Sequence, residues 1–172
     1  MNRFIKGCFC LLLALSSLSL LGGCNNEDDV AAVFTGKTWK LSRLTTKGSS
    51  APFYPGIWNN DKDMKESLNK LNRETSYFTI EFKGEELEGE LLGTNVSGQG
   101  SGATFSGTWS ADGKSRSLTL NLKTQGTEND PLGKAFINGL QNVYKYEGDM
   151  HSLTLYFKDG GATRVIGLTP NK

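Results

Sequence analysis

Apolar and polar residues alternate along most of this chain, and this period of two constrains the fold more than any other feature. Phe78, Ile80 and Phe82, for example, share one face of a predicted strand whose other face is polar. Further predicted strands are residues 38–42, 87–91, 104–109, 118–122, 143–146, 153–157 and 164–168. Strands with one apolar and one polar face are typical of antiparallel sheets. The chain is therefore predicted to be mainly β.

Turn sequences separate several of these strands. Residues 111–114 and 158–161 each contain Asp-Gly between alternating segments, which predicts hairpin turns. Residues 93–102 are rich in Gly and Ser, and we predict a mobile loop there. Strands joined by such turns are predicted to pair as neighbours in an antiparallel sheet.

Two segments change to a period near 3.6 and are predicted to be short helices. In residues 61–72 the recurring apolar residues fall on one helix face. In residues 130–141, Asp130 can cap the helix and Pro131 suits its first position. We expect both helices to cover an opening or an edge of the sheet.

The side chains predicted to point inward are bulky. They are Trp39, Phe78, Phe82, Phe105, Trp109 and Phe157. An eight-stranded barrel has room for side chains or for one small ligand. We therefore predict an interior filled by side chains.

The N-terminus has the features of a bacterial lipoprotein signal. Arg3 and Lys6 precede an apolar segment, residues 8–21, which is too short to span a membrane. Leu21-Gly22-Gly23-Cys24 follows it and matches a lipobox, so Cys24 is the predicted lipidation site. The sequence thus predicts attachment to a membrane through lipid on Cys24, in the cell envelope.

Three parts of the chain follow from this signal. We predict a signal peptide over residues 1–23, a lipidated cysteine with a flexible acidic tether over residues 24–33, and one β domain over residues 34–172. The acidic residues after Cys24 also resemble a surface-export signal of Gram-negative anaerobes. An outer-membrane lipoprotein on either the periplasmic face or the cell surface fits this pattern.

Cysteine and charge content exclude several function classes. Removal of the signal takes away two of the three cysteines, Cys8 and Cys10, and lipidation uses Cys24, so no free thiol remains for a disulfide or a nucleophile. Loss of Arg3 and Lys6 changes the net charge from +1 to −1. A chain without basic excess is a poor nucleic-acid partner. With one histidine we expect no metal and no cofactor.

The loop at residues 52–58 carries three aromatic residues, Phe53, Tyr54 and Trp58. Prolines stiffen this loop and lower the entropy cost of presenting the rings. If exposed, these side chains are candidate contacts for a glycan or an envelope-protein partner. The alternative is that the loop packs against one end of the barrel, with the helix at 61–72 closing over it.

Catalytic residues are not evident. His151 lies at a predicted hairpin tip, and a tip offers no dry pocket for a triad. Glu88 and Glu90 share a predicted strand face and project side by side instead of flanking a cleft. We therefore expect a protein that is not an enzyme.

The C-terminal half contains a strand at residues 105–109, a helix-strand unit at residues 136–146 and an L-T-L-x-x-x-D-G hairpin at residues 153–160. In this order they resemble the META/HslJ-like lipoprotein family. The family stretches G-C-N-x-x-x-G and M-A-C are absent. The N-terminal Gly36-Lys37-Thr38-Trp39 equally matches lipocalin-like proteins. The resemblance implies a strongly curved antiparallel sheet or a lipocalin-like barrel of about eight strands, in an envelope protein without a catalytic set.

Together these features predict a lipid-anchored envelope protein that acts as a non-catalytic binding or structural module. Two alternatives remain open. One is a carrier of a small hydrophobic ligand in the barrel interior, and the other is a carboxylate-dependent hydrolase.

Overall fold

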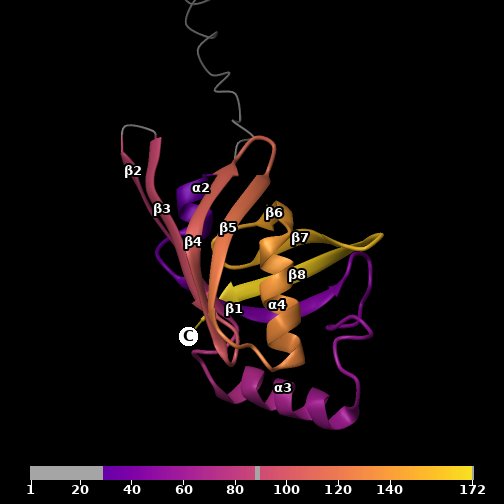
Figure 1. Ribbon diagram of the computed structural model, residues 1–172. Coiled ribbons are helices and arrows are strands. Elements are labelled where there is room, and N and C mark those ends of the chain that lie inside the picture. The colour runs from indigo at the N-terminus through magenta and orange to yellow at the C-terminus, as the bar shows by residue number, and fades with distance from the viewer. Residues whose placement is uncertain (1–28, 88–89, 172) are drawn as a thin grey trace, which may run out of the picture.

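Eight antiparallel strands close into a barrel in the order β1-β2-β3-β4-β5-β6-β7-β8 in the computed structural model (Figure 1). The structure describes residues 29–87 and 90–171, and these include three helices. The helices are α2 (Val30–Phe34), α3 (Asp61–Arg73) and α4 (Pro131–Gln141). The prediction of a mainly β fold and a barrel of about eight strands is confirmed.

Every strand pairs with its neighbour in sequence, and β8 returns to β1. The strands are β1 (Thr38–Thr46), β2 (Thr79–Leu87), β3 (Glu90–Gln99), β4 (Ala103–Asp112), β5 (Ser117–Gly126), β6 (Val143–Gly148), β7 (Leu153–Asp159) and β8 (Ala162–Pro170). The predicted Asp-Gly turns join β4 to β5 and β7 to β8.

Helix α4 covers the weakest seam of the barrel. β5 and β6 pair at Ser117 and Lys145 alone, and α4 packs against the neighbouring strands β5, β7 and β8 (Figure 1). Its apolar face is buried at Leu132, Phe136 and Leu140. Because β5 and β6 share little backbone pairing, burial of the apolar face of α4 helps to hold the barrel closed there.

Aromatic side chains fill the barrel. All six residues that the sequence predicts to point inward are buried. Phe82 and Trp109 meet edge to face with ring centroids 5.3 Å apart, and Phe105 meets Phe136 of α4 at 6.3 Å. Such contacts add to the burial of large apolar areas.

The sequence analysis missed helix α2. It assigned residues 24–33 to a flexible tether, but α2 begins at Val30, with the Asp29 side chain accepting a hydrogen bond from the Ala32 amide. Phe34 is fully buried, and its ring contacts Phe82, Trp109 and Tyr146 at centroid distances of 4.9, 5.1 and 4.8 Å. Burial of this ring fixes a segment whose own sequence is too short to show a helical period.

The predicted mobile loop at residues 93–102 is wrong, since residues 93–99 belong to β3. Gly98 is required there by packing. A Cβ atom at this position would lie 2.2 Å from the Thr79 carbonyl oxygen and 2.5 Å from the Phe105 ring. The glycine that looked like a loop signal therefore lets two strands approach a core ring.

The predicted strand at residues 87–91 is also wrong, because β2 ends at Leu87 and β3 begins at Glu90. Residue 88 lies outside the described residues. So do the predicted signal peptide and Cys24. Within the described residues, no helix has the length and apolarity needed to cross a membrane.

Candidate functional site

The aromatic loop at residues 52–58 closes the free edge of β1. β2 pairs with β1 only as far as Lys40, and beyond it the loop takes over. The Leu44 amide donates to the Pro52 carbonyl at 2.8 Å, and the Tyr54 amide donates to the Leu44 carbonyl at 2.9 Å. These bonds satisfy backbone groups that β2 no longer reaches.

The three aromatic residues of this loop are half-buried. The Phe53 and Trp58 rings meet edge to face at 5.4 Å, and the Arg164 guanidinium lies 4.1 Å from the centre of the Tyr54 ring. Burial is the main reason that the pKa of the Tyr54 phenol is raised. The structure places all three rings against other parts of the domain, and their role as ligand contacts stays a prediction.

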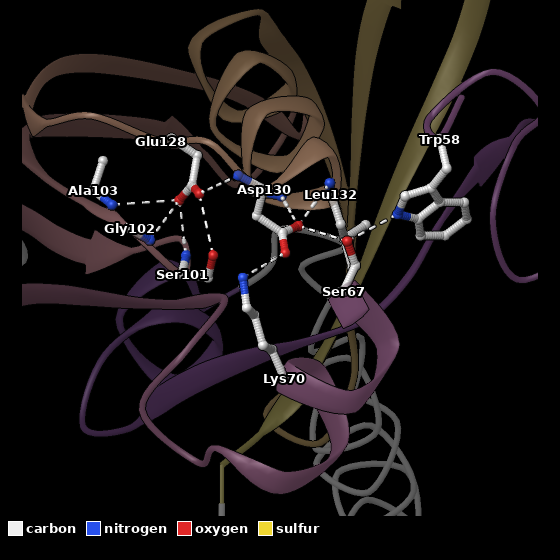
Figure 2. A network of polar contacts seen from close by, with 10 residues as sticks. Trp58, Ser67, Lys70, Ser101, Gly102, Ala103, Glu128, Asp130 and Leu132 are labelled. Atoms are coloured by element: carbon white, nitrogen blue, oxygen red, sulfur yellow. Dashed lines mark hydrogen bonds and ion pairs between the residues drawn. The ribbon is translucent and has the colours of Figure 1, made fainter. Parts of the chain in front are cut away.

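A chain of polar contacts connects the loop to both long helices (Figure 2). Trp58 Nε1 donates to Ser67 Oγ of α3 at 2.9 Å, and Ser67 Oγ donates to Asp130 Oδ1 at 2.8 Å. The Lys70 ammonium lies 3.1 Å from the other Asp130 oxygen. Asp130 caps α4 as predicted, because its side chain accepts from the Leu132 amide at 2.9 Å. This network fixes the loop, α3 and α4 relative to one another.

Glu128 makes a second polar cluster beside it (Figure 2). Its carboxylate accepts from the amides of Ser101 and Gly102 at 2.8 and 3.0 Å, and from the Asp130 amide at 3.0 Å. An added Cβ at Gly133 would lie 2.4 Å from this carboxyl carbon. The carboxylate thus ties the turn between β3 and β4 to the start of α4.

The spacing of Ser67 and Lys70 is that of a nucleophile and its base in some acyl-transfer enzymes. Ser67, however, has 0% exposed surface. Its hydroxyl donates to Asp130 and accepts from Trp58. A buried hydroxyl that already donates one hydrogen bond and accepts another cannot contact a substrate, so this Ser-Lys arrangement is structural.

A polar groove runs over the outer face of β2 to β5. It consists of two adjoining hollows of about 650 and 570 Å³, which share Ser97 and Ser106. Most of its polar side chains are short and uncharged: Asn95, Ser97, Gln99, Thr104, Ser106, Thr108, Asn121 and Gln125. Three charged residues also line it, Glu81, Lys83 and Lys123, and Glu81 and Lys83 lie 3.8 Å apart as an ion pair. Hydroxyl and amide groups both donate and accept hydrogen bonds. The groove can therefore bind a ligand rich in hydroxyl groups.

The family of the chain follows from a comparison with family models. A model described as "Domain of unknown function (DUF4847)" matches residues 25–170. The chain belongs to the DUF4847 family. This corrects the resemblance to META/HslJ-like proteins, which rested on strand and turn sequences that many small antiparallel barrels contain.

A solved structure of a DUF4847 protein has the same fold. It is the crystal structure of a DUF4847 family protein from Bacteroides vulgatus ATCC 8482 at 1.00 Å resolution. The two chains are 24% identical, with a TM-score of 0.59, and the match covers 81% of this chain and 96% of the other. No curated protein matches this chain.

Of the other candidate residues of this DUF4847 protein, His151 lines a hollow of about 800 Å³ together with Lys40, Leu71 and Thr169. His151 is exposed beside Asp149 at the hairpin between β6 and β7. The described residues contain no cluster of three or more His, Cys, Asp or Glu that could hold a metal ion. Sequence reasoning missed the polar groove because its Ser, Thr and Asn residues look like an ordinary solvated strand face.

Proposed function

We propose that this DUF4847 protein is a lipid-anchored envelope protein that binds a glycan non-catalytically through its outer surface. The observation that carries the proposal is that the barrel interior is filled by side chains while a polar groove is open on its outer surface. The filled interior favours binding outside the barrel over transport inside it. The lipobox ending at Cys24 supports a position in the outer membrane, on its periplasmic face or at the cell surface.

The barrel interior argues against a carrier of small hydrophobic ligands. Trp39, Phe78 and Phe157 have 0% exposed surface and lie in one continuous apolar core. Phe34 of α2 and Phe136 of α4 add two more buried rings. A carrier keeps an interior cavity for its ligand, whereas side chains occupy this space.

The uncharged centre of the groove, where its two hollows meet, favours a neutral glycan. Ser97 and Ser106 lie opposite each other on β3 and β4, at the point where the two hollows meet. Their hydroxyls, with the Gln125 and Asn121 amides of β5, can exchange hydrogen bonds with sugar hydroxyls. Groups of this kind bind sugars weakly when no exposed aromatic ring is available for stacking. We therefore expect modest affinity.

A glycan array with the full chain in non-ionic detergent tests this function. We expect neutral glycans to bind, and the double variant Ser97→Ala/Ser106→Ala to bind about tenfold more weakly, because two hydrogen bonds are lost. The matched control is Ser110→Ala/Thr119→Ala, an opposed pair outside the groove on β4 and β5. Absence of glycan binding, or an equal loss in the control, would contradict the proposal.

A further inference from the structure

A second outer face, formed by β6, β7, β8 and β1, is rich in cations. Tyr156 of β7 lies near its centre, with Lys145 of β6 on one side and Val165 of β8 on the other. Val165 in turn lies opposite Thr45 of β1. We call this the cationic face, and its long outward side chains are Arg43, Lys47, Lys145, Glu147, Tyr156 and Lys158.

Cations converge on the Tyr156 ring from two directions. The Lys145 ammonium, from the neighbouring strand, lies 5.6 Å from the ring centre. The Lys47 ammonium, from the residue that follows β1, reaches across β8 and also lies 5.6 Å from the ring centre. Both distances are within the range of a cation–π contact. Lys158 makes a similar contact with the Tyr144 ring, at 5.7 Å.

Small residues of β8 let the β1 side chains cross this face. Arg43 lies directly over Gly167, since a Cβ there would be 2.5 Å from Arg43 Cγ. Burial raises the pKa of Tyr156 to about 12, with the Glu147 hydrogen bond acting in the same direction and the Arg43 charge against it. The Arg43 guanidinium is thus close enough to act electrostatically on the same phenol.

Acidic groups do not balance this charge. Glu147 is the carboxylate of the face, and it accepts from the Lys145 ammonium at 2.8 Å and from the Tyr156 hydroxyl at 2.6 Å. These hydrogen bonds lower the pKa of Glu147. Across the described part of the chain, Arg43, Lys47 and Lys158 form no ion pair with a carboxylate. Like charges held together without counter-charges favour an anionic ligand.

We propose that the cationic face binds an acidic polysaccharide through its sulfate or carboxylate groups. This goes beyond the proposed function, because it uses a different face and a different ligand charge. Neighbouring strands lie about 4.8 Å apart, so the cations of β6, β7 and β1 can meet several charges along one polymer. Arg43 and the lysines can hydrogen-bond these oxyanions, and the Thr163 hydroxyl of β8 lies within the same face.

The geometry favours an acidic polysaccharide over single-stranded nucleic acid. Proteins that bind single strands stack bases on open aromatic faces. Here two lysine ammonium groups lie over the Tyr156 ring and one lies over the exposed Tyr144 ring, so the face does not offer a series of open rings for successive bases. The cationic face can still recognise a ligand through its charged and hydroxyl groups, and a polymer of acidic sugars offers matching groups.

Titration of the full chain in non-ionic detergent with heparin, polygalacturonate and dextran tests this proposal. We expect one or both acidic polymers to bind and dextran not to compete with them. Binding should weaken as NaCl rises from about 50 to 300 mM, because salt screens exposed charges. Arg43→Glu/Lys47→Glu should bind the acidic polymer at least about tenfold more weakly. Ser97→Ala/Ser106→Ala should leave this affinity unchanged, which separates the two proposed sites.

The control variant is Lys62→Glu/Lys65→Glu, which makes the same charge change on the exposed side of α3. It should keep the affinity for the acidic polymer within about twofold. An equal loss in this control would show binding to net charge and would overturn the site. Failure of both acidic polymers to bind, or tighter binding of a single-stranded DNA that depends on Arg43 and Lys47, would overturn the polysaccharide assignment.

Discussion

At the scale of single residues, Trp58 shows how a loop aromatic becomes part of the domain. Its ring packs on Phe53, and its Nε1 donates to the buried Ser67 hydroxyl. We expect Trp58→Ala to lower the free energy of unfolding by about 2–4 kcal/mol, because both contacts are lost. Trp58→Phe keeps most of the ring contact and should cost about 1 kcal/mol. Urea unfolding followed by circular dichroism measures both values.

An unchanged urea midpoint for Trp58→Ala would contradict this packing and favour a ring presented to a partner. The sequence could propose both roles for Trp58 but could not decide between them. Ser67 is nine residues away, and Asp130 is a further 63 residues along the chain. A hydrogen-bonded chain between such distant residues leaves no local pattern in the sequence.

At the scale of elements, helix α2 is a short segment held in place by two buried side chains, Val33 and Phe34, of which Phe34 is the larger. Phe34 has 0% exposed surface, and its carbonyl accepts from Trp39 Nε1 at 3.1 Å. We expect Phe34→Ala to lower the free energy of unfolding by about 3–5 kcal/mol, since it empties a site among three rings. Val30→Ala, at the partly exposed start of α2, is the control and should cost much less. A cost below about 1 kcal/mol in urea unfolding of Phe34→Ala would show that α2 is not seated in the barrel.

Elements with a clear period were predictable from the sequence, whereas elements built from small residues were not. The helix α4 begins at Pro131 beside its predicted cap, and β7 contains the whole predicted strand at 153–157. β3 was missed because Gly98 is selected by close contact with Phe105 and not by strand propensity. The polar groove was missed because its Ser, Thr and Asn residues look like a solvated strand face, and because β3, which supplies part of it, was not predicted. Both features depend on contacts between residues far apart in the chain, and the local sequence does not show such contacts.

At the scale of the whole molecule, the barrel places apolar residues inside and leaves two polar surfaces of different chemistry outside. The polar groove lies on β2 to β5, and the cationic face lies on β6, β7, β8 and β1. Because the barrel is closed, these surfaces belong to different sectors of its circumference. Under the two proposals above, one domain would contact a neutral and an acidic glycan at the same time.

Attachment to the envelope is the last prediction, and it depends on Cys24. Acyl chains on this residue would anchor the protein, because each buried CH₂ group contributes about 0.8 kcal/mol. We expect Cys24→Ser to move the protein out of the membrane fraction and to abolish labelling by radioactive palmitate. Cys10→Ser is the matched control, since it replaces a cysteine before the lipobox, and it should leave both readouts unchanged. Palmitate label that persists on Cys24→Ser would contradict lipidation at Cys24, while leaving the groove and the cationic face to be judged by their own binding tests.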